Sequence, residues 1–224
     1  MALTIHPSVR EAFPDLKVLT CRIEGVKVSR RNEALERLKG EVVEEVKAKY
    51  RLEGLGNLPT FKAYRAFFWR VGVDPTKNRP ASEALIRRIL RGNPPPTINT
   101  LVDAYNLASV KSEVALAAFD LDAVKGELTM RFASEGEEFL GIGMEKPIRL
   151  RGGEIVISDS EKLVAIYPYR DAENTKVTEQ TRNVLILVCG VPGLPKEKLS
   201  QAAEVAVNLI IKFCGGSLVE EKLS

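Results

Sequence analysis

The sequence predicts an α+β fold in which a mixed or antiparallel sheet is flanked by helices. Apolar residues recur at helical spacing in several stretches, above all in Glu33–Leu52, where they share one face of a helix. Short runs rich in β-branched residues, such as Glu154–Ser158 and Val184–Val188, have the length and composition of strands. These helices and strands do not alternate regularly, as they would around a parallel sheet, so we expect an α+β arrangement.

The elements follow one another along the chain with clear boundary signals. Asn32 is placed to cap the long helix, and either Asn78 or Ser82 is placed to cap the helix that starts at Ala81.

The stretch Phe61–Val71 is rich in aromatic residues. Stacking of these residues on nucleic-acid bases is one interpretation, and filling of the protein core is the favoured one. Predicted helices span 8–13, 33–52, 61–71, 81–91 and 195–213, with a short turn at 178–182. Predicted strands span 16–23, 127–132, 148–150, 154–158, 163–167 and 184–188, and 220–224 is expected to fray.

Composition indicates an ordinary globular protein. Apolar residues make up 45% of the 224 residues and charged residues 28%, which leaves room for a substantial core. The three cysteines have no metal-binding spacing, so we expect free, buried thiols in a reducing compartment. The N-terminus does not resemble a signal peptide, and no apolar run is long enough to span a membrane. These observations predict a soluble, cytoplasmic protein.

The most unusual stretch is Thr97–Asp120, which carries short polar residues inside an apolar run. Asn99, Asp103 and Asn106 are spaced four and three apart, so on a helix they form one polar stripe. Short amides and carboxylates fix geometry by hydrogen bonding, whereas a solvated helix face usually carries Lys and Glu. The stripe is therefore predicted either to line a binding site or to hold the helix against neighbouring backbone.

Charge is unevenly distributed along the chain. The segment 61–91 carries eight basic residues against two acidic ones, whereas 120–161 carries ten acids against five bases. On the helix that begins at Ala81, Arg87, Arg88 and Arg91 cluster opposite the apolar face, with no acid expected to face them. Such a cluster is typical of a surface that binds a polyanion, and a merely solvated basic face is the alternative.

Standard catalytic motifs are missing from the sequence. There is no phosphate-binding loop, no complete GxGxxG placed between a strand and a helix, and no nucleophile elbow. The only histidine, His6, has no second histidine with which to bind a metal. We therefore expect neither a cofactor nor a metal ion.

Two blocks of sequence resemble a known family. The first is Asn99-x-x-Val102-Asp103-x-x-Asn106 followed by Ala118-Phe119-Asp120, and the second is Val177–Ile186, which reads VTEQTRNVLI. In this order and spacing they resemble the B3/B4 domain of the β subunit of bacterial-type phenylalanyl-tRNA synthetase. The segment Arg79–Arg88 (RPASEALIRR) and the Arg170-Asp171 loop resemble stand-alone B3/B4 proteins. Ala117 stands where the synthetase block has histidine, and the glycine-rich segment of the synthetase is replaced by Tyr167–Asp171.

The resemblance implies an editing domain that hydrolyses mischarged aminoacyl-tRNA, here in trans. It implies a B3/B4 domain at 79–216, an N-terminal extension of helices and a strand at 1–78, and a C-terminal tail at 217–224. Asp103 and Asp171 are the candidate catalytic residues that would order water or hold the substrate amine. Substrate-binding candidates are Asn99, Asn106, Arg170, Thr175 and Thr181; RNA-binding candidates are Arg79, Arg87, Arg88 and Arg91. The alternatives are a non-catalytic RNA-binding module and a module that binds an amino acid or nucleotide.

Overall fold

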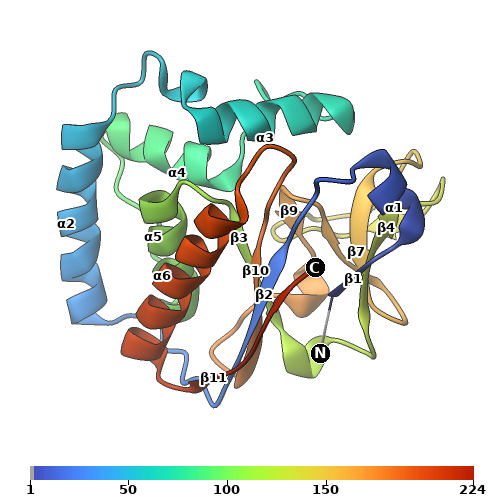
Figure 1. Cartoon of the computed structure of the whole chain (residues 1–224). Helices are drawn as coiled ribbons and strands as arrows, with labels where there is room; N and C mark the ends of the chain where they lie inside the picture. Colours follow the sequence, from blue (N-terminus) through green and yellow to red (C-terminus); the bar gives the residue numbers. More distant parts are fainter. Residues whose placement is uncertain (1–2) are drawn as a thin grey trace.

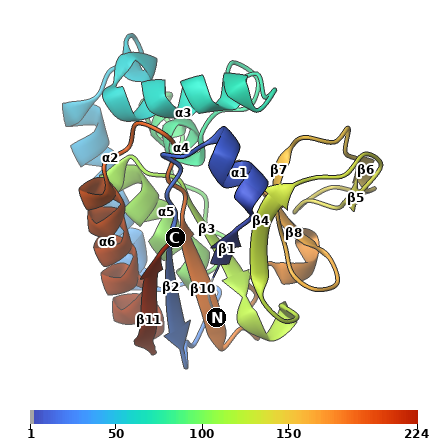
Figure 2. The same ribbon diagram turned by 45° about the vertical axis from the view of Figure 1, so that its right-hand side comes forward.

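The computed structural model describes residues 3–224, which form two large β-sheets, a two-stranded hairpin and six helices. A four-stranded sheet lies in the middle, with the helices α2, α5 and α6 on one side and a five-stranded sheet on the other (Figures 1 and 2). The helix bounds are α1 Pro7–Ala12, α2 Glu33–Lys49, α3 Pro59–Arg70, α4 Ala81–Leu90, α5 Thr100–Ser112 and α6 Lys196–Cys214. Three short 3₁₀ turns complete them: η1 Leu55–Asn57, η2 Leu121–Ala123 and η3 Glu173–Thr175.

The four-stranded sheet is antiparallel throughout, in the order β11-β2-β10-β3. Its strands are β2 Leu19–Glu24, β3 Leu116–Asp120, β10 Asn183–Val188 and β11 Ser217–Leu223. The five-stranded sheet, in the order β1-β4-β7-β8-β9, is mixed because β1 runs parallel to β4. Its strands are β1 Leu3–Ile5, β4 Leu128–Phe132, β7 Ile155–Ser158, β8 Leu163–Ile166 and β9 Arg170–Asp171. A hairpin of β5 Glu138–Phe139 and β6 Ile148–Arg149 forms a third, two-stranded sheet, and Phe139 packs against Val156 and Ile166 of the five-stranded sheet.

Several local predictions can be compared directly with this fold. Asn32 caps α2 as predicted, because its Oδ1 accepts a hydrogen bond of 3.1 Å from the Leu35 backbone N–H. The predicted cap of α4 is wrong: Pro80 is the N-cap and makes no side-chain bond, while the Ser82 hydroxyl donates to the Glu113 carbonyl at 2.8 Å. The predicted helical turn at 178–182 is also wrong, since the segment forms a non-helical turn before β10.

Segments near both ends of the chain form strands of the two large sheets, which the sequence predicted only in part. Residues 217–223 form β11, an edge strand paired with β2, so the expectation of a frayed tail is wrong. The first 78 residues supply β1 to one sheet and β2 to the other, and β2 lies between β11 and β10. The boundary proposed at residue 79 therefore does not separate the sheets, and the domain division stays a prediction.

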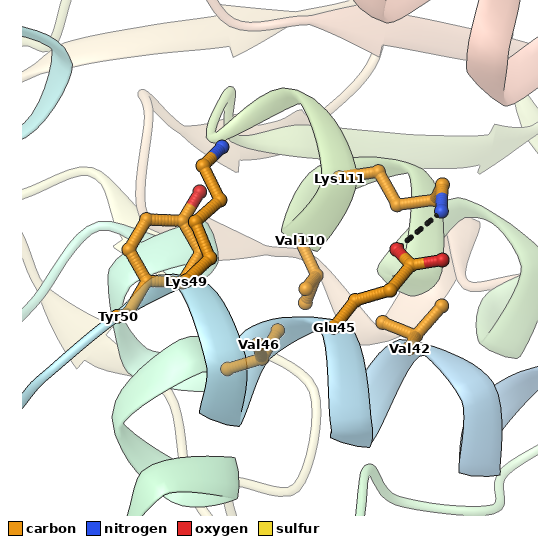
Figure 3. A pocket seen from close by; sticks show the side chains of 7 residues that line it. All are labelled: Val42, Glu45, Val46, Lys49, Tyr50, Val110 and Lys111. Carbon is orange, nitrogen blue, oxygen red and sulfur yellow. Dashed lines mark hydrogen bonds and ion pairs between the residues drawn. The ribbon is translucent and has the colours of Figure 1, made fainter.

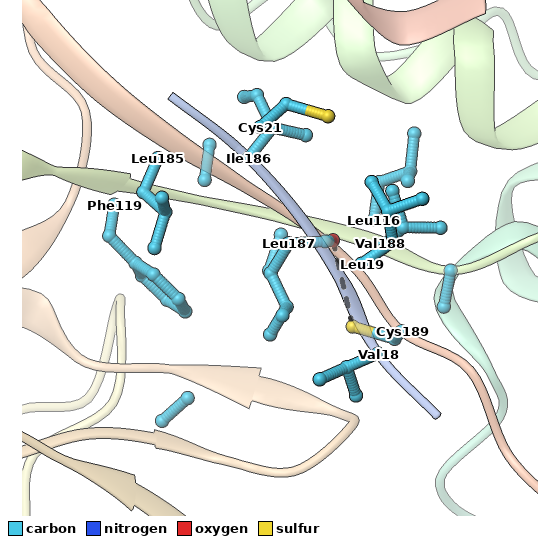
Figure 4. Close-up of a cluster of buried hydrophobic side chains, with 14 of the residues drawn as sticks. Val18, Leu19, Cys21, Leu116, Phe119, Leu185, Ile186, Leu187, Val188 and Cys189 are labelled. Carbon is cyan, nitrogen blue, oxygen red and sulfur yellow. Dashed lines mark hydrogen bonds between the residues drawn. The ribbon is translucent and has the colours of Figure 1, made fainter. Parts of the chain in front are cut away.

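The main core lies on both faces of the four-stranded sheet. Leu187 is paired with Ala117 and Leu185 with Phe119, and these residues are buried between the two sheets. Figure 4 shows these leucines and Phe119 projecting from the same side of the strands. The aromatic residues of α3 mostly fill the core, as the favoured interpretation predicted, since Tyr64 and Phe67 are buried. Trp69 is the exception, at 60% exposed.

None of the helices within residues 3–224 is both long enough and apolar enough to cross a bilayer.

Candidate functional site

A small pocket lies at the junction of the two sheets. Its volume is about 60 Å³, and it is bounded by β3 and β10 on one side and by β8, β9 and their connecting loop on the other. The first residue of α4 closes it. The Tyr167 hydroxyl donates a hydrogen bond to the Gly190 carbonyl, which ties the loop after β8 to the chain after β10. The lining residues are Ala81, Leu116, Ala117, Ala165, Ile166, Tyr167, Pro168, Tyr169, Asp171, Leu187 and Cys189.

Asp171 is the only acidic residue in the lining of this pocket. Its side chain is half-buried, and within residues 3–224 its carboxylate makes neither a hydrogen bond nor an ion pair. Burial raises the pKa of Asp171 to about 7, because the charged form loses water and gains no partner in return. A carboxylate that is about half ionised at neutral pH can accept a proton from a bound water molecule.

Two further polar side chains, Cys189 and Tyr105, lie within electrostatic reach of Asp171. Burial, and then the negative charge of Asp171, raises the pKa of the Cys189 thiol, so this thiol stays protonated near neutral pH. Burial, followed by the charges of Asp171 and Asp103, likewise raises the pKa of Tyr105 on α5. Both groups are therefore neutral hydrogen-bonding groups near the pocket and not nucleophiles. Neither residue was a candidate from the sequence: Tyr105 is next to Asn106 in the chain but off the stripe of Asn99, Asp103 and Asn106, and Cys189 directly follows a predicted strand.

The polar stripe of α5 has a different environment. Asn99 is the N-cap of α5: its Oδ1 accepts from the Val102 N–H at 2.9 Å, and its Nδ2 donates to the Val177 carbonyl at 3.4 Å. Asp103 is buried and accepts hydrogen bonds from Lys39 Nζ at 2.7 Å and from the Ile98 N–H at 2.9 Å. These contacts agree with the alternative in which the stripe holds the helix in place.

None of the three stripe residues lines the pocket between the sheets. Burial raises the pKa of Asp103 even though Lys39 opposes the shift. Asn106 is half-buried, and no hydrogen bond involves its side chain within residues 3–224. A catalytic role for Asp103, and substrate contacts by Asn99 and Asn106, stay predictions.

None of the remaining substrate candidates, Arg170, Thr175 and Thr181, lines the pocket. Arg170 is exposed and its aliphatic part covers Gly141, where an added Cβ would lie 2.5 Å from Arg170 Cδ. Successive strand residues point to opposite faces, so Arg170 and Asp171 diverge. The Thr181 hydroxyl donates to Asp120 at 2.6 Å. Thr175 is buried, and its hydroxyl finds no partner in the described part of the chain.

Part of the positive charge on helix α4 is neutralised by the buried carboxylate of Glu83. Glu83 is buried and accepts hydrogen bonds from Arg65, at 2.6 and 3.0 Å, and from Arg87, at 2.7 Å. The expectation that no acid faces the arginines is therefore wrong for Arg87. Arg88 and Arg91 are exposed, and Arg88 donates to the Pro94 carbonyl at 2.6 Å.

Arg79 precedes α4. Its side chain is half-buried, and its Nε is buried and has no hydrogen-bond partner within residues 3–224. Contacts of Arg79, Arg87, Arg88 and Arg91 with RNA stay predictions.

A second hollow, between α2 and α5, lacks comparable chemistry (Figure 3). It has a volume of about 210 Å³ and a floor that includes Val42, Val46 and Val110. The charged groups at its rim are paired: Lys111 bonds to Glu45 at 2.6 Å. No group of three or more metal-binding side chains occurs anywhere in residues 3–224. The pocket at Asp171 is therefore the better candidate for a reactive site.

The sequence is similar to a known domain family and to subunits of a known enzyme. A model of the B3/4 domain family matches residues 63–215. The phenylalanine–tRNA ligase β subunit of Fusobacterium nucleatum is 30% identical over 148 residues, covering 55% of this chain and 18% of that protein. The β subunit of Protochlamydia amoebophila is 36% identical over 91 residues, covering 40% of this chain and 11% of that protein.

The fold is also found among solved structures. An N-terminal fragment of the phenylalanyl-tRNA synthetase β subunit from Pyrococcus horikoshii matches with a TM-score of 0.51 and 17% identity, over 100% of this chain and 55% of that chain. At this identity the likeness concerns the fold alone, and it confirms the predicted fold class. The chain spans less than a fifth of the length of the two curated relatives described above.

Proposed function

Because the chain belongs to the B3/4 domain family, we propose that it binds aminoacyl-tRNA and hydrolyses the ester bond of a mischarged one in trans. The observation that carries this proposal is the unpaired Asp171 carboxylate in the pocket between the sheets. A buried charge without a partner destabilises a protein, so a group of this kind in a cleft is a candidate functional residue.

In the proposed hydrolysis of the ester, Asp171 acts as a general base. Asp171 accepts a proton from a bound water molecule while the water oxygen attacks the carbonyl carbon of the ester. The resulting tetrahedral oxyanion collapses, and the bond to the ribose oxygen breaks. The proton returns to that oxygen, which leaves a free amino acid and a free ribose hydroxyl. An aminoacyl ester is intrinsically labile, so positioning of water is sufficient and no covalent nucleophile is needed.

We assign the RNA contacts to two exposed arginines at the C-terminal end of α4, Arg88 in its last turn and the C-cap residue Arg91. Ala81 lines the pocket and Arg91 follows ten residues later, which is about 15 Å along a helix at 1.5 Å per residue. Arg88 and Arg91 are exposed and can contact phosphates, whereas Arg87 is held by Glu83. The acceptor end of a tRNA would then lie along α4 with its ester at the pocket, in the cytoplasm where tRNA is charged.

A deacylation assay tests this function. The purified chain is mixed with each of a panel of aminoacyl-tRNAs, and release of the amino acid is compared between the wild type and Asp171→Asn. We expect release above the spontaneous rate for at least one substrate, and loss of that excess in the variant. Binding of tRNA without faster release for any substrate would instead indicate a non-catalytic RNA-binding module.

A further inference from the structure

The pocket at Asp171 is small, and its size limits what it can hold. An engineered cavity of about 150 Å³ in a protein core binds a benzene ring. The pocket between the sheets has a volume of only about 60 Å³. It therefore has room for a few water molecules or for a small aliphatic group, but not for a phenyl ring.

The walls that set this size come from both sheets. Ala117 on β3 and Ala165 on β8 keep the pocket open, because their methyl side chains project little. Leu187 on β10 and Tyr167 close it from the sides, and both are almost fully buried. The Tyr167 hydroxyl is anchored to the Gly190 carbonyl, so this wall is held in place. A tightly packed wall resists expansion, because displaced side chains would have to leave favourable rotamers.

We infer that the site selects aminoacyl-tRNAs whose amino acid has a side chain no larger than that of alanine or serine. This inference rests on the proposed function and specifies its substrate class. Apart from Asp171, the lining is mostly apolar, so a methyl or hydroxymethyl group fits it while a longer side chain meets Leu187 or Tyr167. The aromatic substrates phenylalanine and tyrosine are excluded by volume.

The test compares substrates and pocket variants. The wild-type chain is assayed with tRNAs charged with glycine, alanine, serine, leucine, phenylalanine and tyrosine, each corrected for spontaneous hydrolysis. Each additional methylene changes selection in an apolar pocket by roughly 10- to 200-fold. We therefore expect hydrolysis of the alanyl ester to exceed that of the phenylalanyl ester at least about tenfold.

Two neighbouring residues of β3 offer a matched pair of variants. Ala117→Val narrows the pocket and is expected to reduce hydrolysis of the alanyl ester at least about tenfold. Ala118→Val makes the same chemical change one residue further along, on the opposite face of the strand and outside the pocket lining, and is expected to keep activity. Leu187→Ala enlarges the pocket and is expected to admit the leucyl ester, provided that its circular dichroism spectrum shows a folded protein.

The possible outcomes distinguish failure of the proposed size selection from failure of the proposed deacylase function. Hydrolysis that favours the phenylalanyl or tyrosyl ester would overturn the size selection while leaving the deacylase proposal in place. Equal loss of activity in Ala117→Val and Ala118→Val would also overturn it, because the loss would then reflect strand packing. Hydrolysis of no substrate at all would overturn both the proposed function and the inference.

Discussion

Replacing Asp171 with asparagine is expected to make the protein more stable at alkaline pH. Folding raises the pKa of this carboxyl from 3.8 to about 7, because the folded environment removes water and supplies no partner. A shift of about three pKa units corresponds to roughly 4 kcal/mol at 1.36 kcal/mol per unit. The side chain is only half-buried, so solvent screening lowers this value, and we expect a gain of about 1–3 kcal/mol for Asp171→Asn at pH 8.

The sign and the pH range of this effect follow from proton binding. Between pH 4 and pH 7 the folded state holds the Asp171 proton and the unfolded state has released it, so stability falls as the pH rises through this range. Near pH 4 the difference is small, and above pH 7 it is fully developed. The variant has no carboxyl at this position and therefore lacks this component of the pH dependence.

Urea unfolding at pH 4 and pH 8 measures the effect. The free energy of unfolding of Asp171→Asn minus that of the wild type should be near zero at pH 4 and about 1–3 kcal/mol at pH 8. Asp15→Asn, at an exposed site, is the matched control and should change stability by less than about 0.5 kcal/mol at either pH. A variant that is less stable than the wild type at pH 8 would show that the carboxylate has a favourable partner, and would refute the reasoning.

Two further predictions concern the basic surface and the packing of α5. Arg91→Glu should weaken tRNA binding and lower the slope of log affinity against log salt by about 0.7–0.9. Lys125→Glu, at an exposed site in the connection between η2 and β4, should leave both unchanged. Equal slopes for the two variants in a filter-binding series would contradict the assigned surface. Lys39→Met leaves the Asp103 charge buried and unpaired, so urea unfolding should show a loss of about 3–5 kcal/mol. The exposed control Lys47→Met should lose less than about 0.5 kcal/mol, and similar losses for both variants would argue against a structural role for Lys39.

Local sequence patterns predicted most of the elements. The cap at Asn32, the helix that starts at Ala81 and the strand that ends at Val188 depend on residues within a few positions of one another. The edge strand Ser217–Leu223 was missed because it is exposed on both faces and lacks an apolar pattern. Its pairing with β2 joins residues almost two hundred positions apart, and no local signal encodes that contact.

The candidate site was only partly predictable for the same reason. The spacing of Asn99, Asp103 and Asn106 identified the polar stripe, but the buried partner Lys39 is 64 residues away from Asp103. Glu83 appeared as one acid among many bases, and only the fold shows that it is buried against Arg87. Asp171 was identified through the family resemblance, and its unpaired state depends on two sheets meeting around it.

The dependence of deacylation on pH tests the proposed role of Asp171 most directly. The wild-type rate with an alanyl-tRNA, after subtraction of spontaneous hydrolysis at each pH, should rise through a single transition centred near pH 7 and then level off, because the base must be ionised. Asp171→Asn should show no excess over spontaneous hydrolysis at any pH. A wild-type rate that is unchanged between pH 5.5 and pH 8.5, or an Asp171→Asn variant that retains the transition, would contradict the account.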